Sequence, residues 1–267
     1  MQLKSIFDDD LHPDAIKFGM LAGAPTISAI AALLSSLPAE QLPFLVLDPV
    51  MVSTSGHELL SADAATGVLI SQLLPLVHLV TPNIPEAVAL TGYDKAVETI
   101  GDMLALAAEL RAKTGVAAVL LKGGHVSLRR SDVVAAAKEQ KLSVTWDEDE
   151  DGGEIEVLAD FRTTLNLSVS PEVIVDVLVD DGVHLFVGKK VDTTSTHGTG
   201  CTLSAALASV YATEKRAGKA TGKKISQRGV QAAIEYTQSA IASAYPLGRG
   251  HGPLNHYHLT SRRALPP

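Results

Sequence analysis

Nearly continuous apolar runs of strand length recur along this chain, and stretches with helical spacing separate them. Residues 44–47 and 117–121 are apolar at every position, and each run stops at a charged residue. A strand that is apolar throughout is buried on both faces, which is typical of a parallel sheet covered by helices on each side. The chain is therefore expected to fold as an α/β protein.

The expected elements follow this alternation. Pro85 marks the first turn of one helix, because proline is favoured there. A strand pair is expected over 173–182, with Asp180-Asp181-Gly182 as its turn. The other expected strands are 14–21, 44–48, 77–81 and 117–122, and the other expected helices are 25–37, 100–114 and the small-residue run after Gly200.

Polar side chains follow three of these strands, at the edge where open α/β sheets bind ligands. Asp48 ends one strand, Asn83 and Glu86 follow the next, and Lys122 precedes Gly123-Gly124-His125. An amide and a carboxylate suit Mg²⁺, which prefers oxygen ligands. Asn83 and Glu86 equally fit an N-cap and its first-turn partner. Asp48 can likewise cap a loop, and Lys122 can be a surface lysine.

The segment Thr196-His-Gly-Thr-Gly-Cys-Thr202 opens directly into a helix of small residues. Two glycines one residue apart let the backbone turn sharply, and a helix start offers unpaired N–H groups and a positive dipole end to an anion. A lone glycine pair is more often an ordinary strand-to-helix turn. The single cysteine, Cys201, follows the second glycine, and such a cysteine is often an inert buried apolar residue.

Composition limits the function classes. A net charge of −8 argues against a nucleic-acid partner. One cysteine fits a reducing compartment. The acidic N-terminus resembles neither a signal nor a transit peptide, and polar residues interrupt the longest apolar stretch, around 68–80. No membrane partner is expected, and the cytoplasm is the default location.

The glycine-cysteine turn, the Asn83-x-x-Glu86 spacing, Lys122-Gly-Gly-His and Asp48-Pro-Val-Met occur in an order that resembles a known family. They resemble the hydroxymethylpyrimidine/phosphomethylpyrimidine kinases of thiamine biosynthesis, in the ribokinase-like superfamily. The resemblance runs from about Asp8 to His258. It implies a three-layer α/β/α fold with a mostly parallel central sheet, and phosphoryl transfer from ATP to a hydroxymethylpyrimidine or its monophosphate.

The same resemblance implies roles for the residues of the glycine turn. Gly198, Thr199, Gly200 and Cys201 would present backbone N–H groups to the developing charge, and Cys201 would be the base for the acceptor hydroxyl. Lys122 would hold phosphates, with Thr199 also at the nucleotide.

The resemblance further implies a metal site and a substrate pocket. Asp48, Asn83 and Glu86 would arrange Mg²⁺ beside the nucleotide, and Met20 and Val50 would line the pyrimidine pocket. The implied cofactors are ATP and Mg²⁺, and the implied partner is a small pyrimidine. A homo-oligomer stays open.

Two departures from the family pattern create further expectations. The segment Lys17–Leu21 comes early, so the single kinase domain, 1–267, is expected to lack N-terminal strands and a Gly-rich turn. Weak ATP binding and little turnover would follow. Residues 126–172 are expected to be an insertion, whose acidic run 147–153 is favoured as a solvated loop, with a flap over the phosphates as the alternative.

Three other functions stay open at this point. A pyridoxal kinase would share the fold and the ATP chemistry, although the residues around Asp48 and in the glycine turn favour the pyrimidine enzyme. A catalytically impaired remnant could bind nucleotide or a partner kinase. A purely structural fragment would bind no ligand.

Overall fold

The computed structural model describes residues 2–9, 11–51, 63–146, 172–220 and 222–259. In this part of the chain, one mixed sheet has the strand order β1-β2-β3-β4-β7-β8-β6, with the short β5 paired to β7. β1 to β4 are parallel, β7 is antiparallel to β4 and β8, and β6 is parallel to β8. The strands are β1 (Ala15–Phe18), β2 (Phe44–Leu47), β3 (Leu79–Val80), β4 (Ala118–Leu121), β5 (Leu128–Arg129), β6 (Ser143–Trp146), β7 (Glu172–Val179) and β8 (Val183–Lys189).

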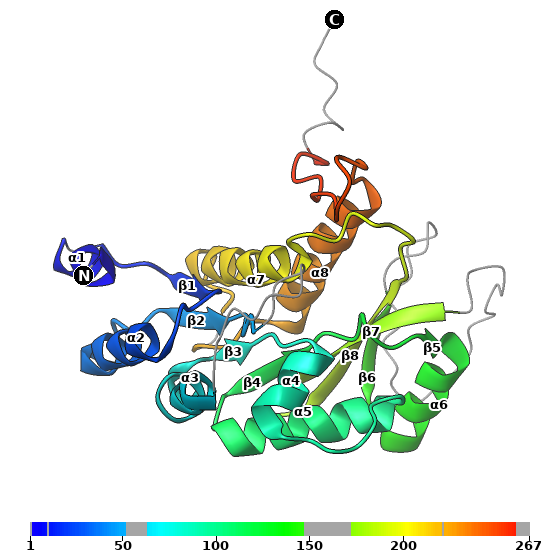
Figure 1. Cartoon of the computed structure of the whole chain (residues 1–267), viewed down its shortest axis with the longest axis horizontal. Coiled ribbons are helices and arrows are strands. Elements are labelled where there is room, and N and C mark those ends of the chain that lie inside the picture. The colour runs from blue at the N-terminus through cyan, green and yellow to red at the C-terminus, as the bar shows by residue number, and fades with distance from the viewer. Residues whose placement is uncertain (1, 10, 52–62, 147–171, 221, 260–267) are drawn as a thin grey trace, which may run out of the picture.

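Helices cover both faces of this sheet (Figure 1). α7 and α8 lie on one face, and α2, α3, α4 and α5 lie on the other, while α1 projects away from the body. The helices are α1 (Gln2–Asp8), α2 (Ala24–Ser36), α3 (Asp63–Val68), α4 (Ile84–Thr91), α5 (Ile100–Thr114), α6 (Arg130–Gln140), α7 (Thr199–Arg216) and α8 (Gln227–Ala242), with π and 3₁₀ turns at Leu69–Leu73 and Leu74–Leu76.

Strand β2 explains why these sequences are apolar at every position. Leu45 and Leu47 pack into a core with side chains of α2, α4 and α5, whereas Phe44 and Val46 pack against α7 and α8. All four side chains are at most 2% exposed. Burying each of them contributes roughly 1.5–3 kcal/mol, so both helical layers are needed to shield such a strand. The predicted three-layer α/β/α fold with a mostly parallel sheet is confirmed.

The predicted elements lie close to the observed ones. The helix expected at 100–114 is α5, and the strand pair expected over 173–182 is the hairpin of β7 and β8, in which Val179 pairs with Val183. The strand expected at 77–81 is shorter, because only Leu79 and Val80 pair with both neighbours. Pro85 lies in the first turn of α4, as predicted.

The expected insertion contains ordinary elements of the fold. Within 126–172, β5 pairs with β7, α6 packs against α5, and β6 extends the sheet beyond β8. The acidic run 147–153 lies outside the described residues. A flap over the phosphates therefore stays a prediction.

Candidate active site

Three residues at the carboxyl ends of β2, β3 and β4 lie together: Asp48, Thr81 and Lys122. The Lys122 Nζ lies 2.9 Å from Asp48 Oδ1 and donates to the carbonyl oxygen of Thr81 at 2.5 Å. The Lys122 backbone N–H donates to the Pro82 carbonyl, which ties the end of β4 to the end of β3. Because the strands are parallel, their ends share one edge of the sheet. The sequence prediction that Asp48 and Lys122 lie at one edge is confirmed.

Asn83 and Glu86 form a capping box at the start of α4. The Asn83 side chain accepts from the Glu86 N–H at 2.8 Å, and Glu86 Oε2 accepts from the Asn83 N–H at 2.7 Å. The capping interpretation is thus confirmed, and the metal role stays a prediction. The same Glu86 oxygen lies 3.8 Å from the Lys122 Nζ. The capping box therefore aims a second carboxylate at the Lys122–Asp48 pair.

Both carboxylates at this edge are withdrawn from solvent. Asp48 is 2% exposed and Glu86 is 9% exposed. Burial raises the pKa of the Glu86 carboxyl, and the nearby Lys122 charge and the Asn83 hydrogen bond oppose that rise. Two buried acids around one lysine are tolerated because each of them is hydrogen-bonded or ion-paired.

The glycine turn reaches the same edge from the other side. Gly198 is the N-cap of α7 and has a φ of +87°, in the left-handed region that glycine adopts without strain. A Cβ atom at Gly200 would lie 3.2 Å from the Lys122 Nζ and 3.3 Å from Asp48 Oδ2. The helix start therefore lies directly against the ion pair. The first-turn N–H groups of α7 have no acceptor within the helix.

Cys201 is exposed, in the first turn of α7. The alternative of a buried cysteine is therefore wrong, and a role in catalysis stays a prediction. α7 buries a different side of itself, with Leu203, Ser204 and Leu207 against the sheet.

The two residues expected at the pyrimidine pocket follow β1 and β2 at the same edge. Met20 is 63% exposed, and Val50 is partly buried. Ser53-Thr54-Ser55-Gly56, which follows Val50, lies outside the described residues. A role in substrate binding stays a prediction for both Met20 and Val50.

One residue of this region escaped the sequence analysis. Asp176, in β7, accepts a hydrogen bond from the Gly123 N–H at 2.9 Å. Burial raises the pKa of the Asp176 carboxyl to about 6, while the Gly123 hydrogen bond and the Lys122 charge oppose that rise. An acid within the apolar run from Val173 to Val179 was the available signal, because such a residue needs a partner when it is buried.

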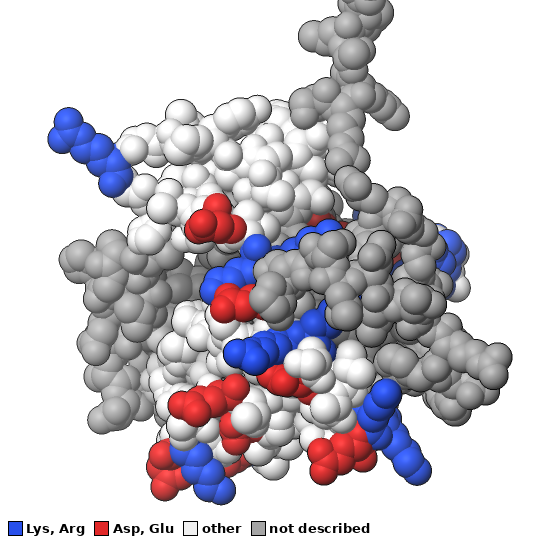
Figure 2. Space-filling view, turned by 90° about the vertical axis from the view of Figure 1, so that its right-hand side faces the viewer, with Lys and Arg blue, Asp and Glu red and all other residues white. Residues whose placement is uncertain are grey.

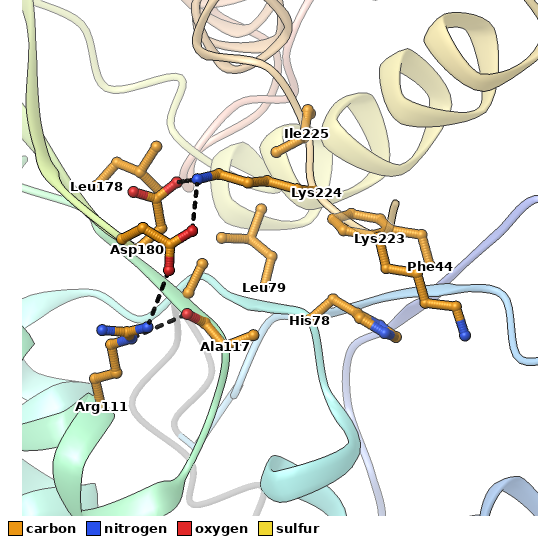
Figure 3. A pocket seen from close by; sticks show the side chains of 12 residues that line it. Phe44, His78, Leu79, Arg111, Ala117, Leu178, Asp180, Lys223, Lys224 and Ile225 are labelled. Carbon is orange, nitrogen blue, oxygen red and sulfur yellow. Dashed lines mark hydrogen bonds and ion pairs between the residues drawn. The ribbon is translucent and has the colours of Figure 1, made fainter. Parts of the chain in front are cut away.

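A cavity of about 240 Å³ lies at the opposite edge of the sheet, where β2, β3 and β4 begin (Figure 3). Its charged side chains are engaged with one another or with the backbone: Lys224 pairs with Asp180 at 2.8 Å, and Arg111 lies 3.8 Å from Asp181. Lys223 donates to the Ala39 carbonyl. These pairs join the β7–β8 turn to α5 and to the loop before α8, which indicates a structural role.

The residues of the strand edge fit a magnesium ion. No group of three His, Cys, Asp or Glu residues is placed to hold a metal ion in the described part of the chain. Asp48 and Glu86 nevertheless direct oxygens toward one position, and the Lys122 ammonium group occupies that position. Magnesium usually keeps several waters and takes further oxygens from substrate phosphates, so two carboxylates are enough.

Figure 2 shows the charged side chains on one face of the molecule. Acidic and basic side chains are interspersed over its described part, and neither sign forms a broad patch. Among the described helices, none has both the length and the apolar character needed to cross a bilayer.

Comparison with known proteins adds a family to this geometry. A family model described as phosphomethylpyrimidine kinase matches residues 1–151 and 162–255. A hydroxymethylpyrimidine/phosphomethylpyrimidine kinase of Rhizobium meliloti is 34% identical over 96% of this chain and 75% of its own length. The thiamine biosynthesis bifunctional protein of Geobacter sulfurreducens is also 34% identical over 96% of this chain, which spans only 40% of that longer protein.

Solved structures agree on the fold. A crystal structure of phosphomethylpyrimidine kinase from Clostridium difficile is 27% identical, with a TM-score of 0.57 over 90% of this chain and 74% of that one. An ADP complex of pyridoxal kinase from Bacillus subtilis is 26% identical, with a TM-score of 0.64 over 95% of this chain and 73% of that one. Both similarities extend over nearly all of the chain.

Proposed function

Because the chain belongs to the phosphomethylpyrimidine kinase family, we propose that it transfers the γ-phosphoryl group of ATP to a pyrimidine. The acceptor is the hydroxymethyl group of hydroxymethylpyrimidine or the phosphate of its monophosphate, and the reaction serves thiamine biosynthesis in the cytoplasm. The observation that carries this proposal is the meeting of Lys122, Asp48 and Gly200 at one strand edge, at the start of α7.

The phosphates of ATP bind at the first turn of α7. The backbone N–H groups of Gly200 and Cys201 have no acceptor within the helix, and the positive end of the helix dipole favours an anion there. The Lys122 Nζ lies 3.2 Å from the position of a Gly200 Cβ, so its charge reaches the same phosphates. Phosphoryl transfer depends on such positioning and on neutralising charge around the transferred group.

Cys201 acts on the acceptor. With the hydroxymethyl group as acceptor, the exposed Cys201 side chain acts as the base and takes the proton of the hydroxyl while the acceptor oxygen bonds to the γ-phosphorus. The bond from that phosphorus to the bridging oxygen breaks, and ADP leaves with the electron pair. Thr199 contributes to the nucleotide site. Met20 and Val50, after β1 and β2, contact the pyrimidine ring.

Asp48, Asn83 and Glu86 hold Mg²⁺, directly or through waters. The ion neutralises charge on the β- and γ-phosphates when it is bound with ATP. Without it, the Lys122 ammonium lies next to both carboxylates, 2.9 Å from Asp48 and 3.8 Å from Glu86.

An assay with three acceptors tests the proposal. The purified chain is incubated with Mg²⁺ and ATP and with hydroxymethylpyrimidine, its monophosphate or pyridoxal, and the products are identified by mass spectrometry. Phosphorylation of a pyrimidine, lost in Cys201→Ala while nucleotide affinity stays within about threefold of wild type, supports the proposal. A Cys201→Ala variant with unchanged turnover would contradict the role of this thiol.

Pyridoxal is included because of a specific observation. The Bacillus subtilis pyridoxal kinase matches the fold with 26% identity. Phosphorylation of pyridoxal alone would contradict the pyrimidine acceptor and favour that alternative. Nucleotide binding without transfer to any acceptor would favour a catalytically impaired nucleotide-binding protein.

A further inference from the structure

Strand β4 separates from β7 directly before the candidate site. The last paired residues are Leu121 and Val177. The next residue, Lys122, donates its backbone N–H to Pro82 and pairs with Asn83, so the chain has turned toward the end of β3. The ladder between β4 and β7 ends here, and the backbone groups that follow need other partners.

Asp176 supplies that partner. Its carboxylate accepts the Gly123 N–H at 2.9 Å, from the β7 position next to Val177. The Gly123 backbone also lies directly on β7, because a Cβ atom there would come within 1.8 Å of the Val175 carbonyl oxygen. Close packing and a carboxylate hydrogen bond therefore hold the residue that follows Lys122.

Hydrogen bonds hold the backbone on both sides of the Lys122 side chain. Its ammonium group must reach Asp48 and the start of α7, and its own backbone is bonded to Pro82 on one side. On the other side, the Gly123 N–H donates to the Asp176 side chain. The Asp176 carboxylate is also attracted by the Lys122 charge, which opposes the rise of its pKa on burial. Charge and hydrogen bonding therefore act on the same turn.

We propose that Asp176 is a positioning residue for nucleotide binding: it fixes the Lys122–Gly123 turn so that Lys122 faces the phosphates. The inference rests on the proposed function, because it assigns Lys122 to the phosphates of ATP. Asp176 does not touch the substrate, and its effect passes through the Gly123 peptide.

Two variants of Asp176 separate its hydrogen bond from its charge. Asp176→Ala removes the acceptor and leaves the Gly123 N–H without its partner, and we expect AMP-PCP affinity to fall about 10-fold. KM for ATP should rise by a similar factor, with a smaller change in kcat. Asp176→Asn keeps an oxygen that can accept from Gly123, so its affinity should stay within about threefold of wild type. Glu172→Gln, which removes an exposed acid from the same strand, is the matched control.

Calorimetric titration with AMP-PCP and the amide resonance of Gly123 give the two readouts. We expect the Gly123 amide shift to change in Asp176→Ala and to be largely restored in Asp176→Asn. If wild type binds AMP-PCP and Asp176→Ala binds it equally well, the inference is overturned and the proposed function stands. Equal loss of affinity in the Ala and Asn variants also overturns it. If wild type binds no AMP-PCP, the proposed function fails and takes the inference with it.

Discussion

Gly198 and Gly200 differ in backbone conformation and in the space around them, which allows a paired test of the phosphate site. Gly198 has a φ of +87°, and a Cβ atom added there would have no neighbour within 4 Å. Gly200 lies inside α7 without a positive φ, but its Cβ would lie 3.2 Å from the Lys122 Nζ. One position is strained but open, and the other is relaxed but crowded.

The two alanine substitutions should therefore separate stability from binding. Gly198→Ala should lower the free energy of unfolding by about 1–2 kcal/mol, because a side chain disfavours the left-handed conformation. Gly200→Ala should change it by less than about 1 kcal/mol, because the gain in helix propensity offsets the close contacts with the side chains of Lys122 and Asp48, at 3.2 and 3.3 Å. Nucleotide affinity should follow the reverse order: about 10-fold weaker for Gly200→Ala, and near wild type for Gly198→Ala. A tenfold loss corresponds to about 1.4 kcal/mol, the size of one hydrogen bond to a charged group.

Urea denaturation measures the first quantity, and calorimetric titration with AMP-PCP and Mg²⁺ measures the second. If Gly200→Ala binds AMP-PCP as tightly as wild type, the backbone at this position does not approach the phosphates. If only Gly198→Ala weakens binding, the phosphates lie at another part of the turn.

Two other side chains carry predictions of their own. Glu86→Gln keeps an acceptor for the Asn83 N–H but removes a carboxylate, so the Mg²⁺ concentration for half-maximal nucleotide binding should rise about 10-fold. The free energy of unfolding should fall by less than about 1 kcal/mol, because the capping box is kept. An unchanged Mg²⁺ titration would leave Glu86 only its capping role. Burial and the nearby Lys223 lower the pKa of His78 to about 4. Because the unfolded state then binds more protons between about pH 4 and 6.5, stability should fall by about 1–2 kcal/mol from pH 7 to pH 5, relative to His78→Asn, whose side chain can still accept from the Leu45 N–H. Parallel pH dependence of the two proteins in urea denaturation would show that His78 does not titrate in this way.

The fold followed from local signals wherever those signals were complete. α5 was expected at 100–114 and has these bounds, because Thr99 caps its start and Gly115 ends it in a left-handed conformation. β2 could be predicted because its residues are apolar at every position, which follows from the burial of both of its faces. The meeting of Asp48 and Lys122 followed from the general rule that parallel strands end at one edge.

Long-range pairing was less accessible to sequence reasoning. Nothing local to β7 indicates that it pairs antiparallel with β4, some fifty residues earlier along the chain, as Leu121 does with Val177. The partner of Asp176 depends on that pairing, so its role could not be read from the sequence. Exposure of Cys201 likewise depends on which side of α7 packs against the sheet, which its small residues do not distinguish.

A crystal structure of the chain with AMP-PCP and Mg²⁺ tests most directly whether this strand edge binds nucleotide phosphates. The expected result places the terminal phosphates within hydrogen-bond distance of the Gly200 and Cys201 N–H groups and of the Lys122 Nζ, with the metal between the phosphates and the carboxylates of Asp48 and Glu86. Phosphates bound away from the start of α7, with the Lys122–Asp48 pair untouched at 2.9 Å, would contradict the proposed function.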